Sequence, residues 1–237
     1  MNIGTVVEGP TDRLVLQAVI ERLCPGDHRY FPLQPPTTMG ETGTGWKGVR
    51  RWCHETWQRK GASLDKMLSS GTGPALDILV IHVDADIATE PDLQEGTDEP
   101  VLNVQQPCPP AEATANQLRR VVLRWLQRDG FPPQVLVAIP AQDTENWTFA
   151  ALFPGDELCA RKDYECARQG RDHPGYRLTL KKYGKLLARS GGQIKKPVAN
   201  YRGIAPRVAG TWDTVRRICS QADRFSHDVF EAAKEDV

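Results

Sequence analysis

The sequence predicts an α/β fold in which a mostly parallel sheet is flanked by helices and followed by a basic, mainly helical C-terminal region. Two observations carry this prediction. Short apolar runs alternate with segments of helical periodicity through the first 157 residues. The strongest run, residues 77–83, is apolar on both faces, which is typical of an interior strand of a parallel sheet.

The expected elements alternate along the chain. Strands are expected at residues 3–7, 30–33, 77–83 and 134–139, and helices at 12–23, 46–60, 111–129 and 145–152. Pro10 or Thr11 suits the start of the first helix, and residues 34–45 and 88–110 are rich in turn formers and predict loops. No strand is expected beyond residue 157. The predicted organisation is an α/β domain at 1–157 with a helical region at 158–237 packed against it.

Composition and cysteine spacing exclude several classes of protein. The chain is 40% hydrophobic and 25% charged, no apolar run is long enough to span a bilayer, and residues 1–25 lack a signal-peptide pattern. We therefore expect a cytoplasmic protein with no membrane association. The six cysteines form no C-x-x-C pair, so they are expected to be reduced, small, buried residues without zinc.

The zero net charge conceals an uneven distribution of charge. Residues 1–159 hold 13 Lys and Arg against 21 Asp and Glu, whereas residues 160–217 hold 15 against four. A strongly basic stretch in a neutral protein is compatible with nucleic-acid binding. It is equally compatible with electrostatic complementarity between two parts of one domain, and both interpretations stay open.

Acidic residues follow three of the expected strands. Glu8 comes after the first strand, Asp84 and Asp86 after the central one, and Glu145 shortly after the last. Because the carboxyl ends of parallel strands form the ligand-binding edge of such a sheet, these side chains should converge. Carboxylates that converge repel one another unless a cation neutralises them, and hard oxygen ligands suit Mg²⁺ or Mn²⁺. The pattern thus predicts a site for one of these two ions.

Two motifs carry a family resemblance. V-V-E-G-P-T-D at 6–12 and V-D-A-D at 83–86 resemble the signature motifs of the TOPRIM fold, found in topoisomerases, bacterial primases, the maturase of 5S ribosomal RNA and OLD-family nucleases. I-P-A-Q-D-T-E-N-W at 139–147, with N-Y-R-G-I-A and R-I-C-S-Q-A-D-R-F near the end, is similar to a compact TOPRIM-like bacterial family. Members of that family are often encoded beside ABC-type ATPases in phage-defence loci. The TOPRIM resemblance covers roughly residues 1–155.

The resemblance implies roles for particular residues. Glu8 would act as general acid and base or as a metal ligand, Asp84 and Asp86 would be metal ligands, and Asp12 and Glu145 would be accessory metal ligands. Gly9 would permit a tight turn. Lys196 is the candidate cation beside the scissile phosphate. Nucleic-acid contacts are expected from four further basic side chains: Lys181, Lys182, Lys195 and Arg202.

Simpler interpretations exist for several of these residues. Asp12 and Glu145 could be acids that stabilise a helix N-terminus, and Asp84 and Asp86 could be solvated turn residues. His82, inside the central strand, is expected to be a packed core residue rather than a catalyst.

The leading functional hypothesis is a Mg²⁺-dependent nuclease subunit for DNA or RNA that works in anti-phage defence with a separate ABC-type ATPase, with self-association left open. The alternative is a TOPRIM-shaped binding or regulatory subunit without catalysis. Nucleotidyl transfer is disfavoured because no zinc-binding module accompanies the core. A dinucleotide-binding enzyme is disfavoured because no G-x-G-x-x-G follows the first strand.

Overall fold

The sheet is the organising element of the fold. The computed structural model describes residues 1–35, 44–58, 63–69, 75–95, 101–166 and 170–234. Within them, β1 (Asn2–Val6), β2 (Arg29–Gln34), β3 (Ile78–His82) and β4 (Val135–Ala138) form a four-stranded sheet in the order β2-β1-β3-β4. All three strand pairs are parallel. The predicted α/β class and parallel sheet are therefore confirmed, although most of the predicted loop at 34–45 lies outside the described residues.

The strand order creates a switch point between β1 and β3. From β1 the chain passes through α1 (Pro10–Leu23) to β2 on one side, whereas β3 and β4 extend the sheet on the other. Connections that diverge in this way leave a crevice at the carboxyl ends of the two central strands. Glu8 and Asp84 follow those two strands, so the topology brings the expected acids together.

Side chains of successive strand residues point to opposite faces of the sheet and build two cores. In β3, Val80 belongs to one core, whereas Leu79 and Ile81 belong to the other. All five β3 residues are buried, which agrees with an interior strand apolar on both faces. The continuous apolar run in the sequence thus reflects a sheet covered on both sides.

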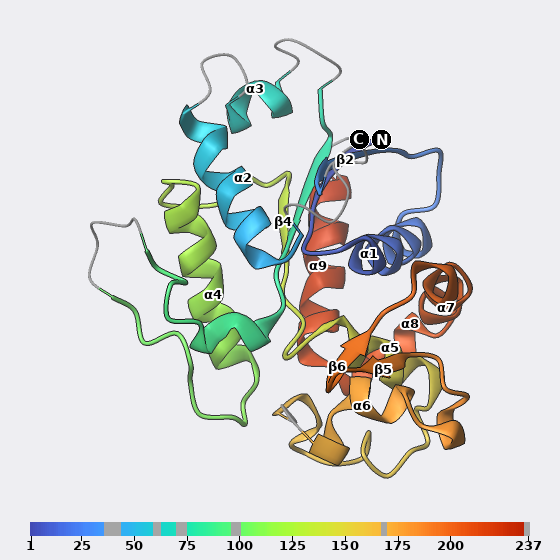
Figure 1. The fold of residues 1–237 in the computed structure, drawn as a ribbon. Coiled ribbons are helices and arrows are strands. Elements are labelled where there is room, and N and C mark those ends of the chain that lie inside the picture. The colour runs from blue at the N-terminus through green and yellow to red at the C-terminus, as the bar shows by residue number, and fades with distance from the viewer. Residues whose placement is uncertain (36–43, 59–62, 70–74, 96–100, 167–169, 235–237) are drawn as a thin grey trace.

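Helices cover each face of the sheet (Figure 1). On one face lie α2 (Trp46–Gln58) and α4 (Glu112–Trp125), where Trp46 stacks on Trp125 with ring centroids 6.4 Å apart. The short helix α3 (Leu64–Leu68) follows α2, and α1 packs on the opposite face. None of the helices in the described ranges is both long and apolar enough to cross a membrane.

Residues beyond 157 complete the core on the α1 face. They include α7 (Val198–Gly210), which packs on α1, together with α8 (Trp212–Ile218) and α9 (Ser220–Lys234). Trp147 of α5 (Thr144–Leu152) makes an edge contact with Trp212 of α8 and stacks near Phe225 of α9, at centroid distances of 5.4 and 6.1 Å. The N-terminal and C-terminal parts of the chain therefore share one hydrophobic core.

A hairpin in the C-terminal region corrects the expectation that no strand follows residue 157. β5 (Ala188–Ser190) pairs antiparallel with β6 (Gln193–Lys195). The connecting residues Gly191 and Gly192 have φ values of 57° and 81°, in the left-handed region that a two-residue hairpin turn requires. With only three residues each and a mainly exposed surface, these strands carry too little apolar alternation to be recognised.

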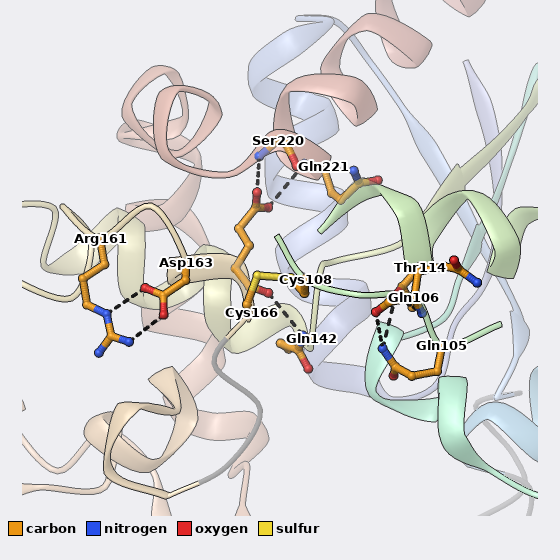
Figure 2. The surroundings of a disulfide bond; sticks show 11 residues. Gln105, Gln106, Cys108, Thr114, Gln142, Arg161, Asp163, Cys166, Ser220 and Gln221 are labelled. Atoms are coloured by element: carbon orange, nitrogen blue, oxygen red, sulfur yellow. Dashed lines mark hydrogen bonds and ion pairs between the residues drawn. A yellow bond between two sulfur atoms is a disulfide. The ribbon is translucent and has the colours of Figure 1, made fainter. Parts of the chain in front are cut away.

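A disulfide corrects the expectation that all cysteines are reduced. Cys108 and Cys166 are bonded, with their Cα atoms 5.6 Å apart, and Figure 2 shows the bridge between two chain segments. The spacing of 58 residues between them carries no motif, so only the folded chain brings them together. Cys24, Cys53, Cys159 and Cys219 are free, and all but the half-buried Cys24 are buried as expected.

Replacing Trp147 by alanine should lower the free energy of unfolding by about 3–5 kcal/mol, because it removes a fully buried ring that joins α5, α8 and α9. Chemical denaturation followed by circular dichroism measures the change. Leu180→Ala is the matched control, since that side chain is exposed and should change stability by less than about 0.5 kcal/mol. Equal effects of the two substitutions would contradict the shared core.

Candidate metal site and cleft

The site lies where the chain leaves β1, β3 and β4. Beyond β3 and β4 the two segments continue side by side, with backbone hydrogen bonds from Ala85 N to Pro140 O (3.2 Å) and from Asp86 N to Gln142 O (3.0 Å). This extension holds Asp84 close to the start of α5. The sheet edge therefore presents acids from three successive strand ends.

Glu8 and Asp84 lie next to each other, as their positions after β1 and β3 predict. Glu8 Oε1 accepts a hydrogen bond from the backbone N–H of Asp84, at 2.8 Å. Burial and the nearby charge of Asp84 raise the pKa of Glu8 well above its ordinary value. Glu8 is thus a half-buried carboxyl that favours the protonated state when no cation compensates it.

Asp12 reaches the same space from the first turn of α1. Pro10 occupies the first position of this helix, as predicted, and Gly9 is its N-cap. The φ of Gly9 is −148°, ordinary extended backbone, so the expected tight-turn role does not apply. Gly9 instead leaves room for the Asp12 carboxylate, because a Cβ at position 9 would lie 3.1 Å from Asp12 Oδ2. Asp12 is 3% exposed, its Oδ1 has no hydrogen-bond partner, and burial raises its pKa despite Lys196.

His82 is fully buried in β3, as expected, but it is also part of the acidic site. Its Nε2 lies 3.2 Å from Asp84 Oδ1 and 3.2 Å from Thr144 Oγ1. Burial lowers the pKa of His82, but Asp84 and the other nearby acids outweigh that effect and raise it to about 9. The same ion pair overcomes burial at Asp84 and lowers the pKa of that carboxyl. The two residues form an imidazolium–carboxylate pair at neutral pH.

Asp12, His82 and Asp84 are arranged to hold a cation. One ligand atom from each lies within 4.8 Å of the others, and this is the one such group found among the residues that the structure describes. Asp12 Oδ1 and His82 Nδ1 are buried without a hydrogen-bond partner, whereas Asp84 Oδ1 is buried in its ion pair with His82. Buried polar atoms are usually paired, so an unpaired carboxylate oxygen and an unpaired ring nitrogen beside the Asp84 carboxylate are available as ligands for a cation.

Lys196 is bound inside the acidic cluster. Its Nζ lies 2.5 Å from Oε2 of Glu145, whose other oxygen accepts a hydrogen bond from the Tyr201 hydroxyl. Burial lowers the pKa of Lys196, but Glu145, Asp12 and nearby acids outweigh this and raise it well above its ordinary value. Glu145 and Tyr201 are fully buried. Glu145 therefore serves as the anchor of a permanently charged lysine.

A second acid–histidine pair forms the rim of the site. Asp143, the N-cap residue of α5, is 7% exposed, and its Oδ2 lies 3.4 Å from Nε2 of His173. Burial and the charge of Glu145 raise the pKa of Asp143 well above its ordinary value, whereas burial lowers that of His173. This pair is suited to exchanging a proton rather than to forming a fixed ion pair.

Several of the residues described above line a cleft of about 570 Å³. Its charged and ionisable lining residues are Asp84, Asp86, Asp143, His173, Arg189 and Lys196. Asp86 is exposed at this cleft, where partial desolvation and the charge of Asp84 raise its pKa to about 7. Arg189 enters from β5, with its guanidinium 5.0 Å from the centre of the Tyr176 ring. The cleft therefore combines acidic and cationic walls.

The remaining basic residues expected to contact nucleic acid lie away from this lining. Lys181, Lys182, Lys195 and Arg202 are exposed, and none is among the described residues that form the cleft. Lys182 Nζ lies 3.7 Å from Asp156. Other cations of the basic stretch are also paired inside the fold, for example Arg177 with Asp156 at 2.7 Å. Part of the local excess of positive charge is therefore compensated within the molecule.

Four participants in the site were missed from the sequence: Asp143, His173, Arg189 and Tyr201. Asp143 had a visible signal, since it precedes Glu145 by two residues in the quoted 139–147 segment. Tyr201 lies in the quoted N-Y-R-G-I-A segment, but that resemblance assigned it no role. His173 and Arg189 lie in stretches with no recognisable pattern, and the fold alone carries them to the cleft. His82 was noticed, but its apolar neighbours concealed its contact with Asp84.

In the absence of divalent cations, thermal stability should fall as the pH rises from 5 to 9. A carboxyl with a raised pKa, such as Glu8, Asp12 or Asp86, loses its favoured proton over this range, which destabilises the folded state. The stabilisation from His82 is complete below about 6.5 and is lost as the pH passes about 9. We expect the melting temperature in chelator to fall by at least about 4 °C.

Thermal unfolding monitored at several pH values in EDTA checks this trend. His82→Gln should flatten the alkaline part of the curve, whereas His227→Gln, on the surface of α9, should leave it unchanged. A melting temperature that is constant or rises toward pH 9 would contradict the electrostatic description of the site.

Comparisons with protein-family models, with curated proteins and with solved structures give no match to this chain. The interpretation of the site therefore depends on its own residues.

Proposed function

We propose that the protein is a divalent-cation-dependent hydrolase of phosphodiester bonds in DNA or RNA. The observation that carries the proposal is the buried group Asp12, His82 and Asp84 at the topological switch point, with its ligand atoms within 4.8 Å of one another. It opens beside a cleft that also contains cationic side chains. An acidic site that needs a cation, beside positive groups that favour an anion, suits a phosphate-bearing ligand.

The ligand atoms favour one of the two expected cations over the other. Two carboxylates and one imidazole include a nitrogen ligand, which Mn²⁺ accepts more readily than Mg²⁺ does. A bound divalent cation would stabilise charge on a phosphate and lower the pKa of a water molecule. Because His82 must lose its proton to act as a ligand, cation binding should release protons. Of the two expected ions, Mn²⁺ is therefore the favoured one.

Neighbouring residues supply the remaining functions. Glu8, held against the backbone N–H of Asp84 and with a raised pKa, is the candidate general acid and base. Lys196, fixed by Glu145, and Arg189 on β5 would bind phosphate oxygens. The His173–Asp143 pair could transfer a proton at the rim. Each role uses a group that already lines or adjoins the cleft.

The motif resemblance is consistent with this proposal. Glu8, Asp84 and the neighbouring Asp86 occupy the positions that the TOPRIM signature motifs assign to acids. From the same resemblance we propose a separate ABC-type ATPase subunit as a partner. Asp12 and Asp84 belong to the expected set of ligands, whereas His82 was not expected. Glu8, Asp86 and Glu145, which were expected as ligands, are outside this group.

A binding subunit without catalysis is the second candidate, and one observation favours it. The Lys196 ammonium contacts Glu145 and interacts with Asp12, Asp84 and Asp143. The chain thus carries its own counter-ion for the acids. If that compensation is sufficient, the cleft could bind a ligand without a metal ion.

Asp12→Asn should weaken Mn²⁺ binding by at least about 10-fold, because the substitution removes a charged ligand while keeping its size. In chelator the variant should melt at an equal or higher temperature, since a buried carboxyl with a raised pKa is replaced by a neutral group. Isothermal titration and thermal unfolding measure the two effects. Asp213→Asn, at an exposed surface pair, should change neither. Unaltered Mn²⁺ affinity in Asp12→Asn would exclude this residue as a ligand.

Cleavage of labelled DNA and RNA in Mn²⁺ or Mg²⁺ tests the reaction itself. Wild-type protein should cleave one of the two polymers, and Asp84→Ala should lose at least about 100-fold in rate while remaining folded by circular dichroism. The assay is run alone and with the proposed ATPase subunit. Metal binding that is lost in Asp12→Asn, combined with no cleavage of either polymer under any of these conditions, would favour the binding subunit.

A further inference from the structure

The disulfide joins segments that belong to opposite faces of the sheet. Cys108 lies in the segment that leads into α4, whereas Cys166 ends the short 3-10 helix η2 (Tyr164–Cys166) on the α5 side. Val104, near Cys108, packs in the core beside α4, and Tyr164, near Cys166, packs in the other core. The bridge therefore connects two segments that pack in opposite cores, and Figure 2 shows Cys108 and Cys166 bonded between them.

Each segment also has anchors of its own. The backbone N–H of Gln106 donates to Thr114 Oγ1 at 3.1 Å, which fixes the Cys108 segment to α4. The Tyr164 hydroxyl donates to the backbone oxygen of Asn146 at 2.5 Å, which fixes η2 to α5. Because both attachments are independent of the sulfur atoms, breaking the bridge should separate the layers locally without unfolding either one.

Hydrogen bonds connect the bridge to the cleft wall, by which we mean the part of the cleft lining formed by Asp86 and Asp143. Glu165, adjacent to Cys166, accepts a hydrogen bond at its backbone oxygen from Gln142 Nε2, at 3.2 Å. The Gln142 backbone oxygen accepts from the N–H of Asp86 at 3.0 Å, and the next residue is Asp143. The Glu165 carboxylate also accepts from the N–H of Ser220 at the start of α9, at 2.9 Å. Two cleft residues are thus close neighbours of the bridge through described contacts.

The bridge is accessible to a reductant. Cys108 and Cys166 are both half-buried, and Cys108 is flanked by the exposed Pro107 and Pro109. By contrast, Cys53 and Cys219 are buried, and burial raises the pKa of both thiols. Thiol–disulfide exchange needs access to a sulfur atom, so the Cys108–Cys166 pair is the site at which such exchange can occur.

We propose that Cys108–Cys166 is a redox-modification site that controls the order of the cleft wall. A dithiol reductant supplies two electrons and two protons: the S–S bond breaks, both cysteines become thiols, and the reductant is oxidised to its own disulfide. Without the bridge, the segment that carries Glu165 is held only by its own layer, so the contacts that run through Gln142 to Asp86 and Asp143 loosen. The Asp12–His82–Asp84 group lies on α1, on β3 and directly after β3, so it keeps its geometry. This effect does not depend on which ligand occupies the cleft.

Hydrogen–deuterium exchange with mass spectrometry tests the proposal on the full chain with and without dithiothreitol. Reduction should accelerate exchange at least about 10-fold in peptides that cover 84–90 and 219–222, while peptides from β3 stay protected. Cys108→Ser should exchange as fast as the reduced wild-type protein, both with and without dithiothreitol. This separates the effect of the bridge from other effects of the reductant. Cys24→Ser, at a half-buried free cysteine, should behave as wild type.

Three results would overturn the proposal. Exchange that changes by less than twofold on reduction would mean that the bridge has no control over the wall. Loss of protection throughout β3 would make the bridge a requirement for global folding. Six free thiols in protein purified without reductant, counted under denaturing conditions, would show that the bridge does not form. Mn²⁺ affinity, measured in parallel, should change less than threefold on reduction, and failure of metal binding itself would count against the proposed function alone.

Discussion

The concentration of carboxylates in a small, largely buried space is the constraint on which the rest of the structure depends. Asp12, Asp84 and Glu145 are almost fully buried, and ligand atoms of Asp12 and Asp84 lie within 4.8 Å of each other. Like charges at about this distance repel by several kcal/mol at an effective dielectric of about 20. Two cationic side chains compensate this charge: His82 lies within the sheet beside Asp84, and Lys196 comes from the C-terminal region and contacts Glu145. Without these partners the acids would protonate or the edge of the sheet would open.

This compensation explains why the C-terminal region belongs to the site. Lys196 immediately precedes the N-cap Pro197 of α7, and α7 packs against α1, which carries Asp12. Tyr201, one helical turn later, fixes the carboxylate that holds the lysine. The hydrophobic packing of α7 on α1 and the electrostatic interaction of Lys196 with Asp12 therefore hold the same two parts of the chain together. The charge asymmetry along the sequence is partly compensated inside the molecule, which agrees with electrostatic complementarity between two parts of one domain.

The sequence predicted the sheet well because β1, β3 and β4 are almost entirely buried and leave short apolar runs, most clearly in β3. Glu8 and Asp84 could be placed together because parallel topology fixes where strand ends meet. Asp143, His173 and Arg189 could not be placed in this way, since their positions depend on how distant segments pack. The Cys108–Cys166 bridge was missed for the same reason, because a sequence separation of 58 gives no local signal. The β5–β6 hairpin was missed because its strands are too short.

That hairpin has a consequence for how such a site can diverge. The acids lie on or beside β1, β3, α1 and α5, where any change in length would disturb the core. Arg189, by contrast, is the middle residue of β5, and Lys196 directly follows β6; these two three-residue strands are joined by Gly191 and Gly192. Side chains alternate between the faces of a strand, so one inserted residue in this turn could reorient a cation while leaving the core intact. The acids and Lys196, which is held by Glu145, are thus tied to the core, whereas Arg189 lies on an exposed hairpin whose length can change with less effect on the fold.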